Sequence, residues 1–318
     1  MAEERGQLII AEAQASPDAP VHPSAPAPGG VDLHMHSHAS DGVLSPTALL
    51  ARAAEAGLRH VALTDHDTVA GLPEARAAAK QHDAQLIDGV ELSCTYRGIT
   101  IHIVGLAFDA QAPSLQQLLT RIHALRQARA EAIAAKLEAA GVHNALARCR
   151  DLAGHDRLTR THFARLLVAS GVARDLKRAF RTHLADGRGA AVRAEWPSMA
   201  EAVTALHAAG GIAVLAHPLR YAKTHSGRDR ILRAFVEAGG DALEISTAAR
   251  DPDATARLLG TARECGLYAS SGSDFHDPEQ RWIRLGTLPR LPEGLPPVWT
   301  HPRWPRATPP AAAERRPQ

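Results

Sequence analysis

The chain has 318 residues, of which 45% are hydrophobic, which is enough for one large core with room for an insertion. Its formal net charge is only +2, so its overall charge does not mark it as a binder of long polyanions. Three widely spaced cysteines and the lack of an apolar run of roughly 18 residues argue against a disulfide framework and a membrane span, and predict a cytoplasmic protein.

The two ends of the chain differ in composition from the part between them. Residues 1–29 are rich in alanine, proline and acidic side chains, and they lack the basic start and the apolar core of a signal peptide. We predict a disordered tail there and a second tail in the Pro/Arg-rich residues 289–318, because neither segment offers enough apolar surface for a core.

From Gly30 onward, short β-like runs alternate with helix-like stretches, and this pattern predicts a parallel α/β architecture. The expected strands are Val31–His36, His60–Thr64, Gln85–Ser93, Thr100–Leu106, Ile212–Ala216, Ala242–Ser246 and Tyr268–Ser271. The first helix has clear boundaries, because Ser45 is a good N-cap, Pro46 suits the first helical position and Gly57 is a typical stop. Further helices are expected at Gly71–Gln81, Ser198–Ala209, Asp229–Ala238 and Asp253–Cys265.

One long stretch interrupts this alternation. Its pattern predicts a single helix over Ser114–Ala140 and two shorter helices over Leu158–Leu184. We therefore divide the chain into a barrel, formed by residues 30–112 and 195–288, and a helical insertion for substrate recognition, residues 113–194, between two of its strands.

Histidine and carboxylate side chains recur at or just beyond the carboxyl ends of nearly all these strands. The candidates are His34, His36, Asp41, His66, Glu91, His102, His217, Asp274 and His276. In a β/α barrel the carboxyl ends of the strands meet at one face, where active sites form. We therefore expect these side chains to lie together at that end of the barrel.

The types of these residues point to a metal centre. His34 and His36 face the same side of a strand, because side chains alternate with a period of two. Imidazole combined with carboxylate suits Zn, Mn or Fe, whereas a set rich in thiolates would indicate structural zinc. Nine candidate ligands exceed the needs of one ion, and clustered ions stabilise the attacking and leaving oxygens of phosphoryl transfer. A lone histidine is more often an ordinary polar residue, but that interpretation does not explain so many at successive strand ends.

Six motifs carry a family resemblance. They are Asp32-Leu33-His34-Met35-His36-Ser37, Thr64-Asp65-His66-Asp67, Gly89-Val90-Glu91, Ile101-His102, Ala216-His217-Pro218 and Gly272-Ser273-Asp274-Phe275-His276. In this order they resemble the polymerase and histidinol phosphatase (PHP) superfamily, from about Val31 to Gly286. The resemblance implies a distorted seven-stranded β/α barrel and a phosphoesterase with three divalent metal ions, which are Mn, Zn or Fe.

The resemblance also implies which residues hold each ion. The implied sets are His34, His36, Glu91 and Asp274 for the first ion, Glu91, His102 and His217 for the second, and Asp41, His66 and His276 for the third. Glu91 would then bridge two ions. Asp32, Asp65 and Asp67 flank these ligands, and we expect them to orient the imidazole rings from behind.

The insertion resembles one branch of the superfamily, whose members act as 3′,5′-nucleoside bisphosphate phosphatases and as 5′–3′ exoribonucleases on short RNA. The runs that carry this resemblance are Leu125–Ala130, Thr159–Ala164 and Ala179–Leu184. They predict substrate binding by residues that they contain.

Four residues of these runs are the candidates for substrate binding. Arg160 and His162 match the branch motif, and a helix opening at Thr161 would present an anion site at its N-terminus beside Arg160. For Arg126 and Arg129 two interpretations stay open, because a guanidinium can bind a phosphate or its stem can cover apolar surface.

The resemblance thus predicts a hydrolase that removes the 3′-phosphate of 3′,5′-nucleoside bisphosphates and acts on short 5′-phosphorylated RNA. A histidinol-phosphate phosphatase and a non-catalytic metal-binding module are the alternatives. With 4% aromatic residues, the chain offers little stacking surface for long single strands. The expected partner is therefore a small nucleotide or a short RNA, with no membrane and no obligate protein partner evident.

Overall fold

The computed structural model describes residues 30–222, 224–245, 252–280, 283–288, 291 and 293–305, without the side chain of Pro252. The predicted tail at residues 1–29 lies outside the described residues, and so do residues 306–318 of the second predicted tail. In the described part of the chain, no helix has the length and apolar character that crossing a membrane would need.

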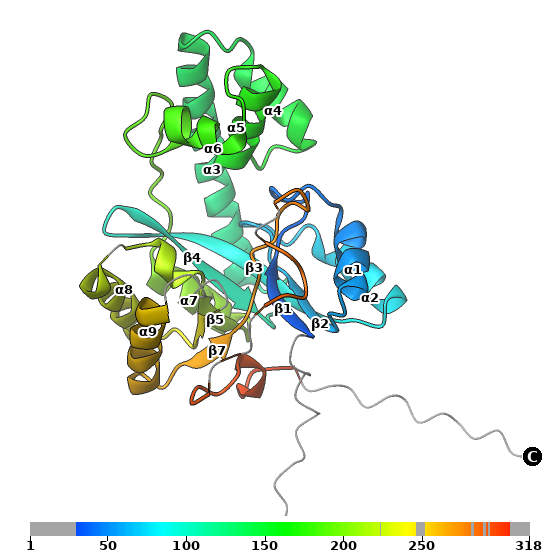
Figure 1. Ribbon diagram of the computed structural model, residues 1–318, viewed down its shortest axis with the longest axis vertical. Coiled ribbons are helices and arrows are strands. Elements are labelled where there is room, and N and C mark those ends of the chain that lie inside the picture. Colours follow the sequence, from blue (N-terminus) through cyan, green and yellow to red (C-terminus); the bar gives the residue numbers. More distant parts are fainter. Residues whose placement is uncertain are drawn as a thin grey trace, which may run out of the picture. The chain divides into compact units, whose positions relative to one another are not determined.

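Seven strands form one curled sheet in chain order, as Figure 1 shows. They are β1 (Val31–Met35), β2 (His60–Leu63), β3 (Gln85–Tyr96), β4 (Ile99–Leu106), β5 (Ile212–Leu215), β6 (Ala242–Glu244) and β7 (Tyr268–Ser270). All seven predicted strands are confirmed, although Ser246 lies outside the described residues. The amide of Leu33 donates to the carbonyl of Ser271 at 2.9 Å, so β1 also meets the segment that follows β7. The sheet therefore curls into the distorted barrel that the sequence predicts.

The prediction of a parallel sheet is wrong at β4, which runs antiparallel to both β3 and β5. Only Arg97 and Gly98 separate β3 from β4, and both have a positive φ, 48° and 77°. A two-residue turn with this geometry reverses the chain into a hairpin. The reversal pairs His102, in the first half of β4, with Ser93 of β3, two residues beyond Glu91.

Five helices belong to the barrel part: α1 (Pro46–Glu55), α2 (Leu72–Gln81), α7 (Met199–Ala208), α8 (His225–Glu237) and α9 (Pro252–Glu264). The predicted start of α1 is confirmed, because the Ser45 side chain accepts from the amide of Ala48. Helix α8 begins about one turn earlier than predicted, since Thr224 caps it by accepting from the amide of Gly227. Helix α1 packs against α2, and α8 packs against α9.

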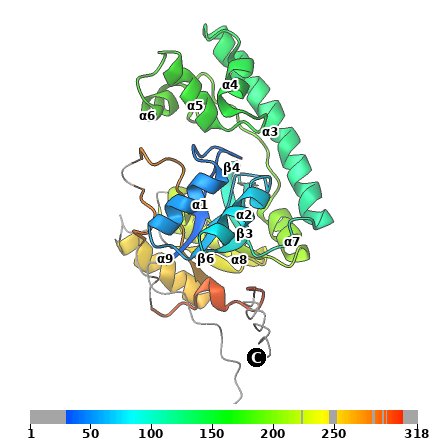
Figure 2. The ribbon, with the colours of Figure 1, turned by 90° about the vertical axis from the view of Figure 1, so that its right-hand side faces the viewer.

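The segment between β4 and β5 is helical, as predicted. It contains α3 (Pro113–Ala139), α4 (Ala145–Ala153), α5 (Arg160–Ala169), α6 (Leu176–Ala179) and a π-helical turn (Phe180–Leu184). Figure 2 shows α3 running from α7 to α4, and it packs against both. Helix α4 is absent from the prediction, because its N-cap Asn144 is left-handed and makes no capping hydrogen bond.

Helix α3 contributes to two separate hydrophobic cores. Leu115 and Ile122, near its start, are buried in the core of the barrel. Ile133 and Leu137, near its end, are buried with Phe163 of α5 in a second core. The first turns of α3 are therefore part of the barrel core, and the later turns fix the position of α4 and α5.

Residues 293–305 do not form the tail that their composition suggests. Val298 is fully buried, and Ala269 of β7 pairs with this segment. Arg303 donates to the carboxylate of Asp241 at 3.1 Å, which ties the segment to the start of β6. The composition misleads because a few apolar side chains, correctly spaced, are enough to dock a short segment on an existing core.

Candidate metal centre

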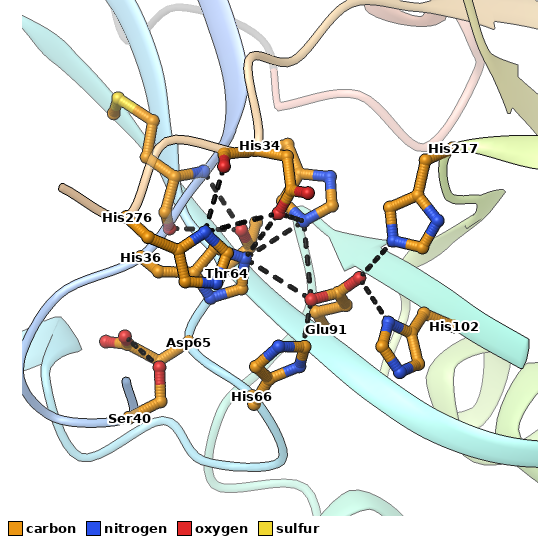
Figure 3. Close-up of polar contacts among 12 residues, drawn as sticks. His34, His36, Ser40, Thr64, Asp65, His66, Glu91, His102, His217 and His276 are labelled. Carbon is orange, nitrogen blue, oxygen red and sulfur yellow. Dashed lines mark hydrogen bonds and ion pairs between the residues drawn. The ribbon is translucent and has the colours of Figure 1, made fainter. Parts of the chain in front are cut away.

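The nine predicted ligand side chains meet at one end of the sheet, and Figure 3 shows most of them around one carboxylate. Three groups have donor atoms within 4.8 Å of one another: His36, Asp41, His66 and His276; His34, His36, Glu91 and Asp274; and His66, Glu91 and His102. His217 lies against the third group, with its Nε2 2.9 Å from Glu91 Oε1. The groups overlap with the implied sets, but His36 also lies in the Asp41 group, and the third group contains His66 in place of His217.

Backbone conformation marks the same region. Asp67, His217 and Asp274 all have a positive φ, at 53°, 28° and 57°. Such a conformation costs roughly 1–3 kcal/mol for a residue other than glycine and persists only where neighbouring contacts impose it. The amide of Asp274 donates to the main-chain carbonyl of His34 at 2.8 Å. The amide of Asp67 donates to the main-chain carbonyl of Glu91 at 2.9 Å. These bonds hold the loops that follow the strands against β1 and β3.

Glu91 is the centre of the cluster and is fully buried. Its Oε1 lies 2.8 Å from His102 Nδ1 and 2.9 Å from His217 Nε2. Its Oε2 lies 2.9–3.4 Å from three further histidine nitrogens, but none of these contacts has hydrogen-bond geometry, and the buried Oδ1 of Asp41 is likewise unpaired. Buried carboxylate oxygens that are ringed by nitrogens without being hydrogen-bonded suit cations placed between them. The donor set therefore fits metal ions.

The electrostatics of the cluster favour charged groups. Burial by itself lowers the pKa of His36, but the interactions of its ring with the carboxylates of Asp274 and Glu91 outweigh burial and raise that pKa to about 10. Burial raises the pKa of Glu91, but the surrounding histidine charges hold it well below its usual value. The carboxylates are therefore ionised, and metal ions that bind here have to displace protons from imidazole rings.

Sequence reasoning missed Glu244, at the end of β6. Its Oε2 lies 2.6 Å from Nδ1 of His34, and both side chains are almost fully buried. This contact fixes the ring so that Nε2 faces Glu91, which is the usual arrangement behind a metal-binding histidine. The signal was available, because Glu244 ends a strand as the predicted ligands do. Arg220, which contacts Asp274, was also missed.

The structure places Asp32, Asp65 and Asp67 differently from the prediction. Among the described residues, none of them hydrogen-bonds to a histidine ring. Asp32 accepts from the amide of Ser273 at 2.9 Å, and Asp65 accepts from the hydroxyl of Ser40 at 2.7 Å. They hold the backbone of the ligand-bearing loops rather than the rings themselves.

A pocket with about 430 Å³ of empty space, part of it open to solvent, lies beside the cluster. Its walls combine candidate metal ligands with arginine and aromatic side chains. They include Asp41, His66, His102, Arg126, Arg129, Arg160, Phe180 and Trp196. The pocket is therefore lined by the barrel and by the helical segment together, and candidate metal ligands and three guanidinium groups share its walls.

The three arginines differ in their partners. Arg126 is 5% exposed, and its Nε donates to Asp67 Oδ2 at 2.6 Å. Arg129 donates to a main-chain carbonyl at 2.9 Å, and both guanidinium groups lie over the ring of Trp196, at 5.2 and 5.6 Å. Arg160 has no hydrogen-bond or ion-pair partner among the described residues. The guanidinium groups of Arg126 and Arg129 are therefore both held at the pocket wall.

Positive charge is in surplus in this pocket. Burial, together with the charges of Arg160 and Arg126, lowers the pKa of Arg129 to about 9. Burial also lowers the pKa of Arg160. Three guanidinium groups that are close enough to repel one another favour a bound anion, because among the described residues only Arg126 is paired with a carboxylate, that of Asp67.

His162 does not line this pocket, contrary to its predicted role in substrate binding. The main-chain amide of Thr159 donates to His162 Nδ1 at 3.0 Å, which closes a capping box at the start of α5. The ring is buried, and burial lowers its pKa to about 4. The structure therefore assigns His162 to the helix cap.

Replacing His162 with Gln should reduce the acid sensitivity of the fold. A histidine with a pKa of 6.5 in the unfolded chain and about 4 in the folded chain binds a proton first in the unfolded state. Stability is therefore lost as the pH falls from 6.5 towards 4. Gln keeps a capping acceptor but does not titrate, so the wild type should lose up to about 3 kcal/mol more than His162→Gln over this window.

Urea unfolding of both metal-free proteins between pH 7 and pH 4 measures this difference. The exposed His143 provides a control, and His143→Gln should follow the wild type. If the free energy of unfolding of His162→Gln changes with pH in parallel with that of the wild type, the buried ring does not carry this acid sensitivity.

Comparison with known proteins places the chain among phosphoesterases. Residues 32–207 match the PHP domain family. The chain is 45% identical over 268 residues to a 5′–3′ exoribonuclease of Haemophilus influenzae, covering 84% of this chain and 97% of that protein. It is 40% identical over 274 residues to a 3′,5′-nucleoside bisphosphate phosphatase of Chromobacterium violaceum, covering 85% of this chain and 95% of that protein.

Solved structures give the same result. An amidohydrolase from Chromobacterium violaceum, with bound sulfate and no metal, has a TM-score of 0.78 at 39% identity, over 85% of this chain and 95% of that one. A protein from Bifidobacterium adolescentis, assigned as a metal-dependent phosphoesterase, has a TM-score of 0.72 at 27% identity, over 87% of this chain and 95% of that one. The similarity therefore extends over both the barrel and the helical segment.

Proposed function

The chain belongs to the PHP domain family, and we propose that it removes the 3′-phosphate of 3′,5′-nucleoside bisphosphates. Its relatives are phosphatases and exoribonucleases, so it is a metal-dependent hydrolase of phosphoric esters. Short 5′-phosphorylated RNA is the second proposed substrate, because a relative at 45% identity is a 5′–3′ exoribonuclease. The main support for the proposal is the guanidinium of Arg160, which has no hydrogen-bond or ion-pair partner in the described part of the chain. It lines the same pocket as three candidate metal ligands, Asp41, His66 and His102.

We propose three divalent ions, Mn, Zn or Fe, for the cluster. His34, His36, Glu91 and Asp274 would hold the first, Glu91, His102 and His217 the second, and Asp41, His66 and His276 the third. When bound, such ions neutralise charge on a phosphate and lower the pKa of water to roughly 7. The orphaned oxygens of Glu91 and Asp41 support this assignment.

The pocket walls support a nucleoside with two phosphates as the substrate. The ester phosphate that reacts would lie at the cluster, near His66 and His102. The phosphate that is retained would lie beside Arg160, which forms no hydrogen bond or ion pair among the described residues and feels the charge of Asp186 only at a distance. The half-buried Phe180 offers aromatic surface to the nucleoside, whereas the ring of Trp196 is covered by the guanidinium groups of Arg126 and Arg129. The residues therefore orient the substrate by its second charge and its base, which places the reacting phosphate.

The alternatives fit less well. Histidinol phosphate carries one phosphate and a cationic amine, so the surplus positive charge of Arg126, Arg129 and Arg160 would repel part of it. A non-catalytic metal-binding module would not need an anion pocket that opens onto the ligands. The pocket therefore favours a nucleotide phosphatase over both.

Changing Arg160 to Ala should lower kcat/KM for a 3′,5′-bisphosphate by roughly ten- to a hundredfold, because one charged hydrogen-bond partner of the retained phosphate is lost. The same variant should hydrolyse p-nitrophenyl phosphate nearly as well as the wild type, because this ester has no second phosphate. Steady-state kinetics on both substrates, at equal metal content, measure the selectivity.

Arg178 is the matched control, because it is exposed in α6 and does not line the pocket. Arg178→Ala should leave both rates unchanged. An equal fall of Arg160→Ala on both substrates would place Arg160 at the reacting phosphate. No fall on either substrate would contradict the proposal that this pocket binds the retained phosphate.

A further inference from the structure

The start of α5 contacts the loop that carries Asp41. The hydroxyl of Thr159 donates to Asp41 Oδ2 at 2.9 Å, and Arg165 donates to the main-chain carbonyl of Asp41 at 2.7 Å. His155 Nε2 lies 2.9 Å from the carbonyl of Ser40. These contacts join segments 115–124 residues apart in sequence, so the helical segment is fastened directly to a ligand-bearing loop of the barrel.

The two oxygens of Asp41 have different surroundings. Oδ2 is hydrogen-bonded to Thr159, whereas Oδ1 has no hydrogen bond and lies 3.3 Å from His276 Nε2 and 3.9 Å from His66 Nε2. The terminal torsion of an aspartate is soft, so the carboxylate needs an external contact to fix its plane. The Thr159 hydroxyl supplies that contact and leaves Oδ1 directed at the two rings.

The Thr159 hydroxyl has one proton, and its surroundings determine where that proton goes. Oγ1 accepts from the amide of Thr161 at 3.1 Å as the N-cap of α5, and the amide of Thr159 itself is taken by His162. Accepting at the cap leaves the O–H free to donate to Asp41. Thr159 therefore touches the cluster on one side and begins the helix that presents Arg160 on the other.

We propose that Thr159 is a positioning residue, which holds Asp41 in the orientation that a cation between Asp41, His66 and His276 requires. The proposal rests on the metal centre proposed above. It makes this one cation site dependent on α5, whereas the sites around Glu91 rest on barrel residues alone. Removing a hydrogen-bond partner from behind a metal ligand weakens metal affinity by roughly 10- to 100-fold.

Calorimetric titration of the full-length, metal-free protein with Mn²⁺ tests the proposal without substrate. Thr159→Val keeps the shape of the side chain but removes the hydroxyl, so one class of sites should weaken roughly 10- to 100-fold while the others keep their affinity. Thr159→Ser restores the hydroxyl and should restore that class of sites. A general loss of structure would weaken every class together.

Thr224 provides the matched control, because it caps α8 by accepting from the amide of Gly227 at 3.2 Å and belongs to none of the donor groups. Thr224→Val should lower the melting temperature but leave the Mn²⁺ titration unchanged. A wild-type titration for Thr159→Val, or equal weakening of all sites in it, would overturn the positioning role. Normal Mn²⁺ binding by a wild type that cannot hydrolyse bisphosphates would overturn the proposed substrate alone.

Discussion

Glu91→Gln should lower kcat/KM for phosphate esters by roughly a thousandfold or more and should reduce the amount of bound metal. Both carboxylate oxygens are within contact distance of histidine nitrogens from several strands, so the substitution removes the charge at the centre of the cluster. It also replaces one acceptor oxygen with an amide that can only donate. A ligand at the edge of the cluster, such as His276, should be less sensitive, because it serves one donor group.

Metal analysis and steady-state kinetics of the purified variants measure this effect. Asp88 is a useful control, because it lies on the same strand and pairs with Arg76 instead of with a histidine. Asp88→Asn should keep metal content and turnover. Full metal content with normal turnover in Glu91→Gln would exclude a bridging role for Glu91.

Arg126→Leu should lower the free energy of unfolding by about 3–5 kcal/mol. Arg126 and Asp67 are both buried, and removing the guanidinium leaves the carboxylate without its counter-charge. Asp67 keeps its hydrogen bonds from the amide and hydroxyl of Ser93, but these do not replace the lost ion pair. The free energy of unfolding should therefore fall by more than the change in side-chain packing alone would cause.

A double-mutant cycle separates charge from packing. Asp67→Asn in the Arg126→Leu background removes the unpaired charge and should recover part of the lost stability. Arg121, on the same helix, forms an exposed ion pair with Glu201, so Arg121→Leu should cost less than about 1 kcal/mol. Urea unfolding at pH 7 measures the wild type, Arg126→Leu, Asp67→Asn, the double variant and Arg121→Leu. The prediction fails if Arg126→Leu loses no more stability than Arg121→Leu.

The order of elements and most of the candidate ligands can be predicted from the sequence, because both depend on local signals. Buried strands are short apolar runs, and in a barrel their carboxyl ends meet wherever the chain places them. Asp41, 118 residues from Thr159, was therefore recognisable as a candidate, whereas its hydrogen bond to Thr159 was not. That contact depends on how the helical segment packs, which no local pattern records.

The other differences between the predictions and the structure also have identifiable causes. The reversal at β4 follows from the positive φ of Arg97 and Gly98, and an Arg-Gly turn is a weaker hairpin signal than Asn-Gly. The role of Arg126 could not be decided from the sequence, because its partner, Asp67, lies 59 residues earlier in the chain. His162 was predicted to bind substrate because it lies in the run Thr159–Ala164, which resembles the branch motif, but its place three residues after Thr159 is also the spacing of a capping box.

The boundary of the insertion remains a proposal, and the two cores suggest where to test it. The first turns of α3, as far as Ile122, belong to the core of the barrel. A deletion of residues 113–194 would therefore remove barrel core together with the second core around Phe163. A deletion that begins after Ile122 keeps the part of α3 that belongs to the barrel core. It is the better test of whether the helical segment confers substrate selectivity.

Phosphate release tests the central claim most directly. The metal-free protein is assayed before and after addition of Mn²⁺ or Zn²⁺, with 3′-phosphoadenosine 5′-phosphate, histidinol phosphate and a short 5′-phosphorylated RNA as substrates. We expect the bisphosphate to release inorganic phosphate only with metal, and with a higher kcat/KM than histidinol phosphate. A protein that binds metal in the cluster but releases phosphate from none of the three, or that hydrolyses them equally well in EDTA, would contradict the account.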